Sequence, residues 1–132
     1  MGTLVAEKSS LTMGKDFGKS IAIPMWAVAV EGGGHKILVD TGIRSLEWVK
    51  HYLGDQYDVL QEEDETVEGA LKAIGWTPDD VDIVINTHLH YDHAGCNYLF
   101  KNARFYVQRA EWEDAFDHVD NQDCFYFEEL YG

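Results

Sequence analysis

Four side chains that bind metal ions in proteins crowd into six residues near the middle of this chain. They are His88, His90, Asp92 and His93, and they include three of the chain's 6 histidines. Neutral imidazole and carboxylate are suitable ligands for zinc, iron, manganese and cobalt, so the cluster predicts a metal site. The two cysteines, Cys96 and Cys124, are too far apart to form the CxxC pair of a structural zinc site.

The spacing divides these candidate ligands into two pairs. In an extended chain His88 and His90 point the same way, because they are two residues apart, and both can bind one ion. Asp92 continues that register but lies where the chain must turn. The adjacent His93 points elsewhere, so it is badly placed for the first ion and, together with Asp92, is placed to bind a second ion. Two ions about 3.5–4 Å apart can hold a bridging hydroxide, which is an arrangement used for hydrolysis. The spacing therefore predicts half of a two-metal hydrolytic site.

The residues around the cluster place it at the end of a strand. An apolar segment, Val81–Asn86, precedes it, the small pair Ala94-Gly95 follows, and Asn97–Phe100 is helix-like. A strand end is a rigid place from which to hold ligands. Two readings without function remain open, namely a histidine-rich surface loop and an inactive metal remnant.

The remaining pattern predicts a layered α/β domain. Strands are expected at Ile21–Val30, at Lys36–Asp40 after a Glu31–His35 hairpin turn, and at Arg104–Gln108. Helices are expected at Leu46–Leu53 after a Ser45 cap, from a Thr66 cap to Ile74, and at Ala110–His118. Residues 1–20 hold one short strand at best, and Gln56–Glu65 is an acidic connector. Alternating strands and helices are typical of an α/β fold.

Composition excludes several classes of function. The net charge of −14 argues against nucleic-acid binding, which needs basic patches. No run of about 18 apolar residues exists, so no membrane span is expected, and the N-terminus lacks the pattern of a secretory signal. A cytoplasmic location is the default. The acidic runs Asp55–Glu68 and Glu111–Glu129 are read as solvated faces rather than as binding sites.

The run from His88 to Gly95 resembles the HxHxDH signature of the metallo-β-lactamase superfamily. Lys36-Ile-Leu-Val-Asp-Thr-Gly42 resembles the strand and Asp-Thr-Gly turn that precede this signature there. The segments Ile23–Trp26, Trp76–Asp80 and Val107–Trp112 resemble the N-acyl homoserine lactonase branch. The resemblance implies a metal-dependent hydrolase of lactone or ester bonds, active in quorum quenching, with a small-molecule substrate and zinc as the favoured metal.

The resemblance also implies a role for each matching residue. His88 and His90 would bind the first ion, and Asp92 and His93 the second. Asp92 would also be catalytic, because it would orient the nucleophile and pass a proton. Asp40 would orient the histidines by hydrogen bonding. Tyr91 and Cys96 stand where lactonases often have phenylalanine and glycine, which leaves the substrate open.

The superfamily's fold is an αβ/βα sandwich of two similar halves, and this chain has about half the expected length. Residues 1–132 would therefore form the N-terminal half of the hydrolase domain, completed by a second chain or a missing C-terminal half. The remaining histidines, His35, His51 and His118, are read as exposed and not as ligands. The aromatics Trp112, Phe116, Phe125, Tyr126 and Phe127 are expected in the core or at the interface with the second half.

Two other functions stay open. The chain could be a subunit or fragment of a split metallohydrolase that is inactive alone, with the remaining ligands on a second polypeptide. More remotely, Asp40-Thr-Gly42 resembles the motif of retroviral-type aspartic proteases, which work as dimers of short chains. That reading leaves the histidine cluster without an explanation.

Overall fold

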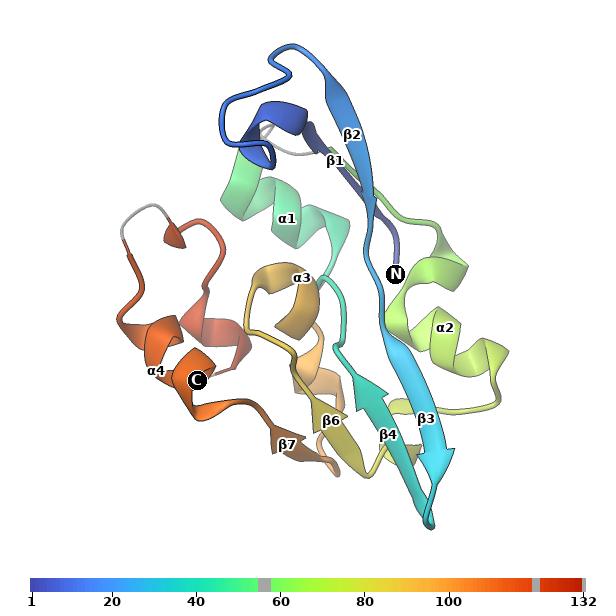
Figure 1. The fold of residues 1–132 in the computed structure, drawn as a ribbon. Helices are drawn as coiled ribbons and strands as arrows, with labels where there is room; N and C mark the ends of the chain where they lie inside the picture. Colours follow the sequence, from blue (N-terminus) through green and yellow to red (C-terminus); the bar gives the residue numbers. More distant parts are fainter. Residues whose placement is uncertain (55–57, 120–121, 132) are drawn as a thin grey trace.

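The computed structural model describes residues 1–54, 58–119 and 122–131, and within them two β-sheets carry the fold (Figure 1). The first sheet has the order β2-β1-β5. Its strand β1 (Thr3–Glu7) pairs antiparallel with β2 (Ser20–Pro24) and β5 (Asp58–Leu60). The second sheet has the order β3-β4-β6-β7, formed by Val28–Gly32, His35–Val39, Ile83–Ile85 and Arg104–Tyr106. Strands β4, β6 and β7 run parallel, while β3 is antiparallel to β4.

Four α-helices connect or cover these strands in the described part of the chain. They are α1 (Leu46–Leu53), α2 (Val67–Ala73), α3 (Tyr91–Ala94) and α4 (Arg109–Phe116). Short 3-10 turns lie at Lys8–Ser10, Glu63–Glu65, Pro78–Asp80, Asn97–Leu99 and Glu128–Leu130. The predicted caps are present, since the hydroxyls of Ser45 and Thr66 accept hydrogen bonds from Trp48 N and Gly69 N. None of the described helices has the length and apolar character needed to cross a bilayer.

Two predictions about the strands are wrong. Ile21–Val30 was expected to be one strand, but β2 ends at Pro24 and β3 begins at Val28 in the other sheet. Proline has no N–H to continue a ladder, and the next residue, Met25, is buried in the cluster around α1. The acidic connector Gln56–Glu65 contains β5, which pairs with β1; positions 56–57 of that connector lie outside the described residues.

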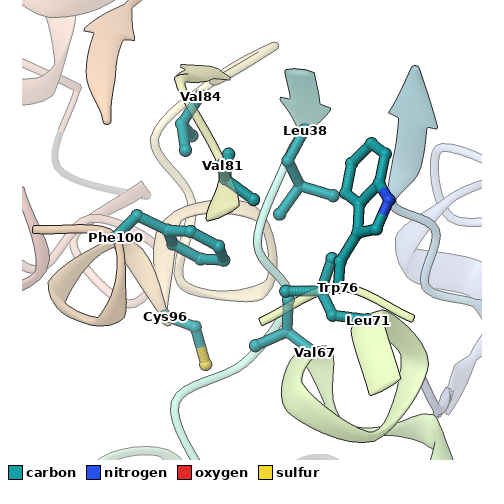
Figure 2. Close-up of a cluster of buried hydrophobic side chains, with 8 residues drawn as sticks. All are labelled: Leu38, Val67, Leu71, Trp76, Val81, Val84, Cys96 and Phe100. Carbon is teal, nitrogen blue, oxygen red and sulfur yellow. The ribbon is translucent and has the colours of Figure 1, made fainter. Parts of the chain in front are cut away.

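The main core lies between the four-stranded sheet and α2. In Figure 2, Leu38 from β4 lies beside Trp76 and above Leu71 of α2, while Val84 from β6 lies with Val81 on the side of Phe100. Phe100 and Val84 are fully buried. The whole cluster comprises Leu38, Val67, Leu71, Trp76, Val81, Val84, Cys96 and Phe100. Burial of these side chains fixes one face of the sheet against α2.

The opposite face of the same sheet carries an apolar row that the described residues leave partly open. Strand register aligns Val28, Val39, Ile85 and Tyr106 in one row, next to the buried row through Leu38 and Val84. Val28 is 53% exposed, Tyr106 48% and Ile85 37%. Alternation along a strand puts successive side chains on opposite faces, so this row is the second, uncovered face.

Candidate metal centre

The histidine loop begins where β6 ends, at the carboxyl edge of the parallel strands. Strand β4 brings Asp40 to this edge, β6 brings Thr87 and the loop after it, and β7 leads into α4. In Figure 1, α3 lies just beyond the arrowheads of β4 and β6. Polar groups from separate strands meet there because the carboxyl ends of parallel strands share one edge. The predicted motif strand and turn are therefore present, with the strand shortened to Ile83–Ile85.

The turn after the loop requires glycine. His90 is the extended residue that precedes α3, and the helix ends at Gly95. A Cβ at Gly95 would lie 2.5 Å from Arg44 N and 2.6 Å from both Gly42 O and Tyr91 O. No other residue fits so close to three backbone atoms, so the small residue of the motif allows α3 to pack against the Asp40-Thr-Gly turn.

The three imidazoles lie together. The ring centroid of His88 is 4.5 Å from that of His90 and 3.9 Å from that of His93. The spacing predicts that His88 and His90 lie together and that His93 points elsewhere. His93 instead returns to the same cluster, because α3 turns its ring back toward the strand end. The first part of that prediction agrees with the structure, and the second part is wrong.

Asp40 links two of these histidines. Its side chain is buried, and its Oδ1 accepts a hydrogen bond from Thr87 N at 2.8 Å. Its Oδ2 accepts one from the Thr87 hydroxyl at 2.7 Å and lies 2.8 Å from His93 Nδ1. Asp40 has a φ of 60°, a left-handed conformation that Asp adopts more readily than most residues. The structure thus brings Asp40 to the histidines.

These contacts define which ring nitrogens are free. His93 Nδ1 donates to Asp40, so Nε2, which faces Asp92, is the ring nitrogen that can bind a metal once it gives up its proton. Because the Thr87 hydroxyl donates to Asp40, its oxygen accepts from His88 Nδ1, 3.1 Å away. His88 Nε2 is then also free to bind a metal. A single carboxylate therefore sets the tautomers of His88 and His93, one of them through a threonine.

Asp92 and His93 form the second predicted pair. Asp92 Oδ2 lies 3.5 Å from His93 Nε2. Two ligands on one tetrahedral ion with bonds of about 2.1 Å would be about 3.4 Å apart, so this pair has the spacing of two ligands. In the described residues, however, no three side chains of His, Cys, Asp or Glu are arranged to hold one ion. The donor chemistry fits divalent metals, and the donors come in pairs rather than in a complete set.

Burial and neighbouring charges lower the pKa of His88 and His90, whereas the pKa of His93 is raised. Burial, and after it the charge of the neighbouring His88, lower the pKa of His90 to about 4. Burial also lowers the pKa of His88, helped by the charge of His93. Burial acts the same way on His93, but hydrogen bonds to Asp40 and Asp92 outweigh it and raise the pKa to about 9. His88 and His90 are thus neutral at neutral pH, as metal ligands must be.

Asp92 is ionised in this setting. Burial alone would raise its pKa, but the hydrogen bond and the charge of His93 lower it overall. The carboxylate is mostly buried, with 20% of its side chain exposed. It can therefore accept a proton or hold a positively charged group beside the histidines.

Sequence reasoning missed three contributors to the site. Thr87 carries the link from Asp40 to His88. Glu111 of α4 accepts hydrogen bonds from Leu89 N at 2.7 Å and from the Tyr126 hydroxyl at 3.1 Å. Phe125 stacks on the His90 ring at 5.0 Å. A signal existed only for Thr87, which directly precedes the motif; Glu111 and the aromatics lie far along the chain.

The other singled-out residues lie away from this cluster or serve packing. His35 and His51 are exposed, as expected. His118 is half-buried, which corrects its reading as an exposed residue, because its ring stacks on Tyr126 and its Nε2 lies 2.9 Å from Asp123 Oδ1. Tyr91 and Cys96 are buried in the two main apolar clusters. Both oxygens of Asp40 are used inside the chain, which leaves the aspartic-protease alternative without support.

The predicted aromatic group behaves partly as core and partly as a wall of the site. Phe127 packs edge-on against Trp48 at 4.7 Å, and Trp112 lies 5.0 Å from Phe116 on α4. Tyr126, by contrast, has its ring 4.7 Å from that of His90. Residues 125 and 126 therefore cover His90, and Phe127 packs beside α1. Trp112 and Phe116 lie beside Tyr131 but stay 43% and 45% exposed, so their expected place in the core is wrong, and a place at an interface stays a prediction.

Comparison with known proteins identifies relatives of this chain. The N-acyl homoserine lactonase of Bacillus thuringiensis is 36% identical over 121 residues, which cover 86% of this chain and 48% of the relative. The lactonase AttM of Agrobacterium fabrum is 34% identical over 125 residues, covering 87% of this chain and 46% of AttM. This chain thus spans about half the length of the curated relatives it matches.

Solved structures agree with this result. The structure of an N-acyl homoserine lactone hydrolase, with the product N-hexanoyl-L-homoserine at its catalytic metal centre, superimposes with a TM-score of 0.80 at 32% identity. That superposition covers 98% of this chain and 52% of the other, so the fold is the N-terminal half of a metallo-β-lactamase fold. The model of the metallo-β-lactamase superfamily matches residues 23–132. The chain therefore belongs to the metallo-β-lactamase superfamily.

Proposed function

We propose that this chain provides one half of a metal-dependent hydrolase that opens lactone or ester bonds. The observation that carries the proposal is the hydrogen-bonded chain from Asp40 to His88 and His93, which occupies Nδ1 of both rings and leaves Nε2 as the nitrogen that can bind a metal. An imidazole held through Nδ1 by a carboxylate is the usual form of a metal-binding histidine. Residues 1–132 would form the N-terminal half of the hydrolase domain.

The ligands divide as the spacing predicts. His88 and His90 are assigned to one divalent ion, and Asp92 and His93 to a second. The 3.5 Å separation of Asp92 Oδ2 and His93 Nε2 supports the second pair. Zinc suits these ligands best, and iron, manganese or cobalt would be accepted by the same set. When bound, such ions supply Lewis acidity and a water nucleophile at neutral pH.

The chain's own residues would then bind, orient and move protons. Asp92 is ionised beside His93, so it can orient the attacking water and take up its proton. Asp40 and Thr87 would hold the histidine tautomers through this step. Phe125 and Tyr126 cover one side of His90 and exclude water from it.

The substrate class follows from the relatives and from the charge. The relatives are N-acyl homoserine lactonases, and one of the similar solved structures is of a quorum-quenching N-acyl homoserine lactone hydrolase. A neutral lactone or ester is also compatible with a chain of net charge −14, which would repel anionic substrates. An N-acyl homoserine lactone is therefore the first substrate to assay. The cytoplasmic location remains a prediction.

A second half is part of the proposal, supplied by a further segment or by a second polypeptide. The apolar row of Val28, Val39, Ile85 and Tyr106 is a face on which another layer can pack. The incomplete ligand set supports the same idea, because four ligands do not fill two ions. In this version the 132-residue chain alone would bind metal weakly and would be inactive.

The test measures which chains and metal ions the purified protein contains, together with its hydrolytic activity. The purified particle should be measured for the intact mass of every chain, for bound metal, and for hydrolysis of an N-acyl homoserine lactone with and without a chelator. We expect chelator-sensitive hydrolysis, lost together with metal in His90→Ala and Asp92→Asn, while the exposed-residue control His51→Ala keeps both. Full metal occupancy with unchanged turnover in Asp92→Asn would refute the proposal. Turnover by the 132-residue chain alone would exclude the inactive-fragment version.

A further inference from the structure

Glu111 joins two parts of the molecule on a single oxygen atom. Its Oε1 accepts the backbone N–H of Leu89 at 2.7 Å and the hydroxyl of Tyr126 at 3.1 Å. Glu111 lies in the first turn of α4, where a carboxylate is favoured by the helix dipole. The side chain is half-buried, so these contacts are partly shielded from water.

The first contact holds the residue between two candidate ligands. Leu89 separates His88 from His90 and is 2% exposed. Its side chain packs with Ala94 of α3 and Ala115 of α4. In an extended segment, the orientation of one residue decides the direction of its two neighbours. The bond from Glu111 to the Leu89 amide therefore determines that His88 and His90 point to the same side.

The second contact acts on His90 from the other direction. The Tyr126 ring lies 4.7 Å from the His90 ring, and the two residues form an isolated β-bridge. The neighbouring Phe125 accepts the Tyr91 N–H at 3.0 Å through its carbonyl oxygen. Holding the Tyr126 hydroxyl keeps this short segment, and with it the His90 ring, in place.

We propose that Glu111 is a positioning residue for the metal centre, which sets the relative placement of His88 and His90 by holding the Leu89 amide and the Tyr126 hydroxyl together. The proposal rests on the proposed function in one respect, namely that these histidines bind a divalent ion. Glu111 itself is not assigned as a metal ligand, since its Oε1 already accepts hydrogen bonds from two donors.

Two conservative variants of Glu111 separate the effect of its hydrogen-bond geometry from the effect of its charge. Glu111→Gln loses the charge but keeps a side-chain oxygen at the same distance, and one oxygen is enough because both bonds end on Oε1. Glu111→Asp keeps the charge but is one methylene shorter, so it cannot reach both donors. Glu113→Gln and Glu113→Asp are matched controls, because Glu113 is exposed on the same helix.

The first measurement is Co²⁺ affinity, followed by the absorption of the bound ion, for the full 132-residue chain. We expect Glu111→Asp to weaken affinity by about tenfold or more and to alter the spectrum, and Glu111→Gln to stay within about threefold of the original chain. The Glu113 variants should not differ from the original. Equal losses in both Glu111 variants, a loss only in Glu111→Gln, or no loss in Glu111→Asp would each overturn the proposal.

The second measurement needs no metal. Hydrogen exchange of the Leu89 amide should be slow in the original chain and in Glu111→Gln, and at least about tenfold faster in Glu111→Asp. The same exchange rate in all three chains would overturn the positioning role. If the original chain binds no Co²⁺, the proposed function fails, and this exchange measurement still decides the part played by Glu111.

Discussion

Replacing Asp40 with asparagine tests the hydrogen-bonded centre of the site without disturbing its backbone. Asparagine tolerates the left-handed φ of 60° at this position, and it has nearly the same size. Its amide can still accept the Thr87 N–H. The asparagine side chain cannot accept a hydrogen bond from protonated His93. Its NH₂ group, a donor, would replace the carboxylate oxygen that now lies 2.8 Å from His93 Nδ1. The variant therefore removes the partner that favours the charged imidazole.

The size of the effect follows from the pKa of His93. The rise from 6.5 to about 9 corresponds to about 3 kcal/mol of stability, and it is shared between Asp40 and Asp92. We assign about 2 kcal/mol to Asp40, in line with a charge-assisted hydrogen bond. Because the folded pKa is raised, this stability is fully present below about pH 6.5 and is lost as the pH rises through about 9.

The assay is urea unfolding of the metal-free chain with a chelator present, followed by tryptophan fluorescence at about pH 6 and about pH 10. Asp40→Asn should lower the free energy of unfolding by about 2 kcal/mol more at the lower pH than at the higher. The Thr87 bonds contribute equally at both values and cancel in this difference. As a control, Asp123→Asn removes an exposed partner of His118 and should change stability by less than about 1 kcal/mol. An equal loss from Asp40→Asn at both pH values would refute the reasoning.

Three further changes test other parts of the structure. Thr87→Val removes the hydroxyl between Asp40 and His88, and it should weaken Co²⁺ affinity by about tenfold; unchanged affinity would contradict the tautomer assignment. Phe100→Ala empties a fully buried position and should cost about 3–5 kcal/mol in urea unfolding; a cost below about 1 kcal/mol would contradict its place in the core. Gly95→Ala should cost about 1–3 kcal/mol, whereas Gly32→Ala, at a site with open space, should melt close to the original temperature; equal melting of both variants would argue against the tight turn.

The elements predicted correctly from the sequence are those set by local chemistry. The helix Leu46–Leu53 has the predicted bounds, because the Ser45 hydroxyl caps it and Gly54 ends it with a φ of 61°. Thr66 caps α2 in the same way. The strand before the histidine motif and the turn after it are likewise set by neighbouring residues. Each of these signals acts within a few positions along the chain.

The errors arise where distant partners decide the structure. The apolar run Ile21–Val30 contains two strands, since its halves pair with β1 in one sheet and with β4 in the other. An apolar run has no periodic feature that marks such a change of sheet. Strand β5 is short and acidic, and it exists because β1 offers a free edge for antiparallel pairing. The sequence around Asp58 carries little sign of that pairing.

The site residues also divide into those set by local signals and those set by distant partners. The ligand candidates were predictable because their spacing and residue types are local. Glu111 was not, because it contacts Leu89 across 22 positions of the chain, and only the parallel order of β6 and β7 brings α4 to this edge. The half-buried state of His118 was missed for a related reason, since Tyr126 and Asp123 reach it from the C-terminal segment.

Two carboxylates from different strands hold the histidine loop by its backbone. Asp40, after β4, accepts the Thr87 amide, and Glu111, after β7, accepts the Leu89 amide. These amides alternate with His88 and His90, so binding the first set orients the second set. The placement of the histidines thus depends on the positions of β4 and β7 on either side of β6. Changes that shift these strands should therefore alter metal affinity even where no ligand is touched, because the backbone bonds to Asp40 and Glu111 set the directions of His88 and His90.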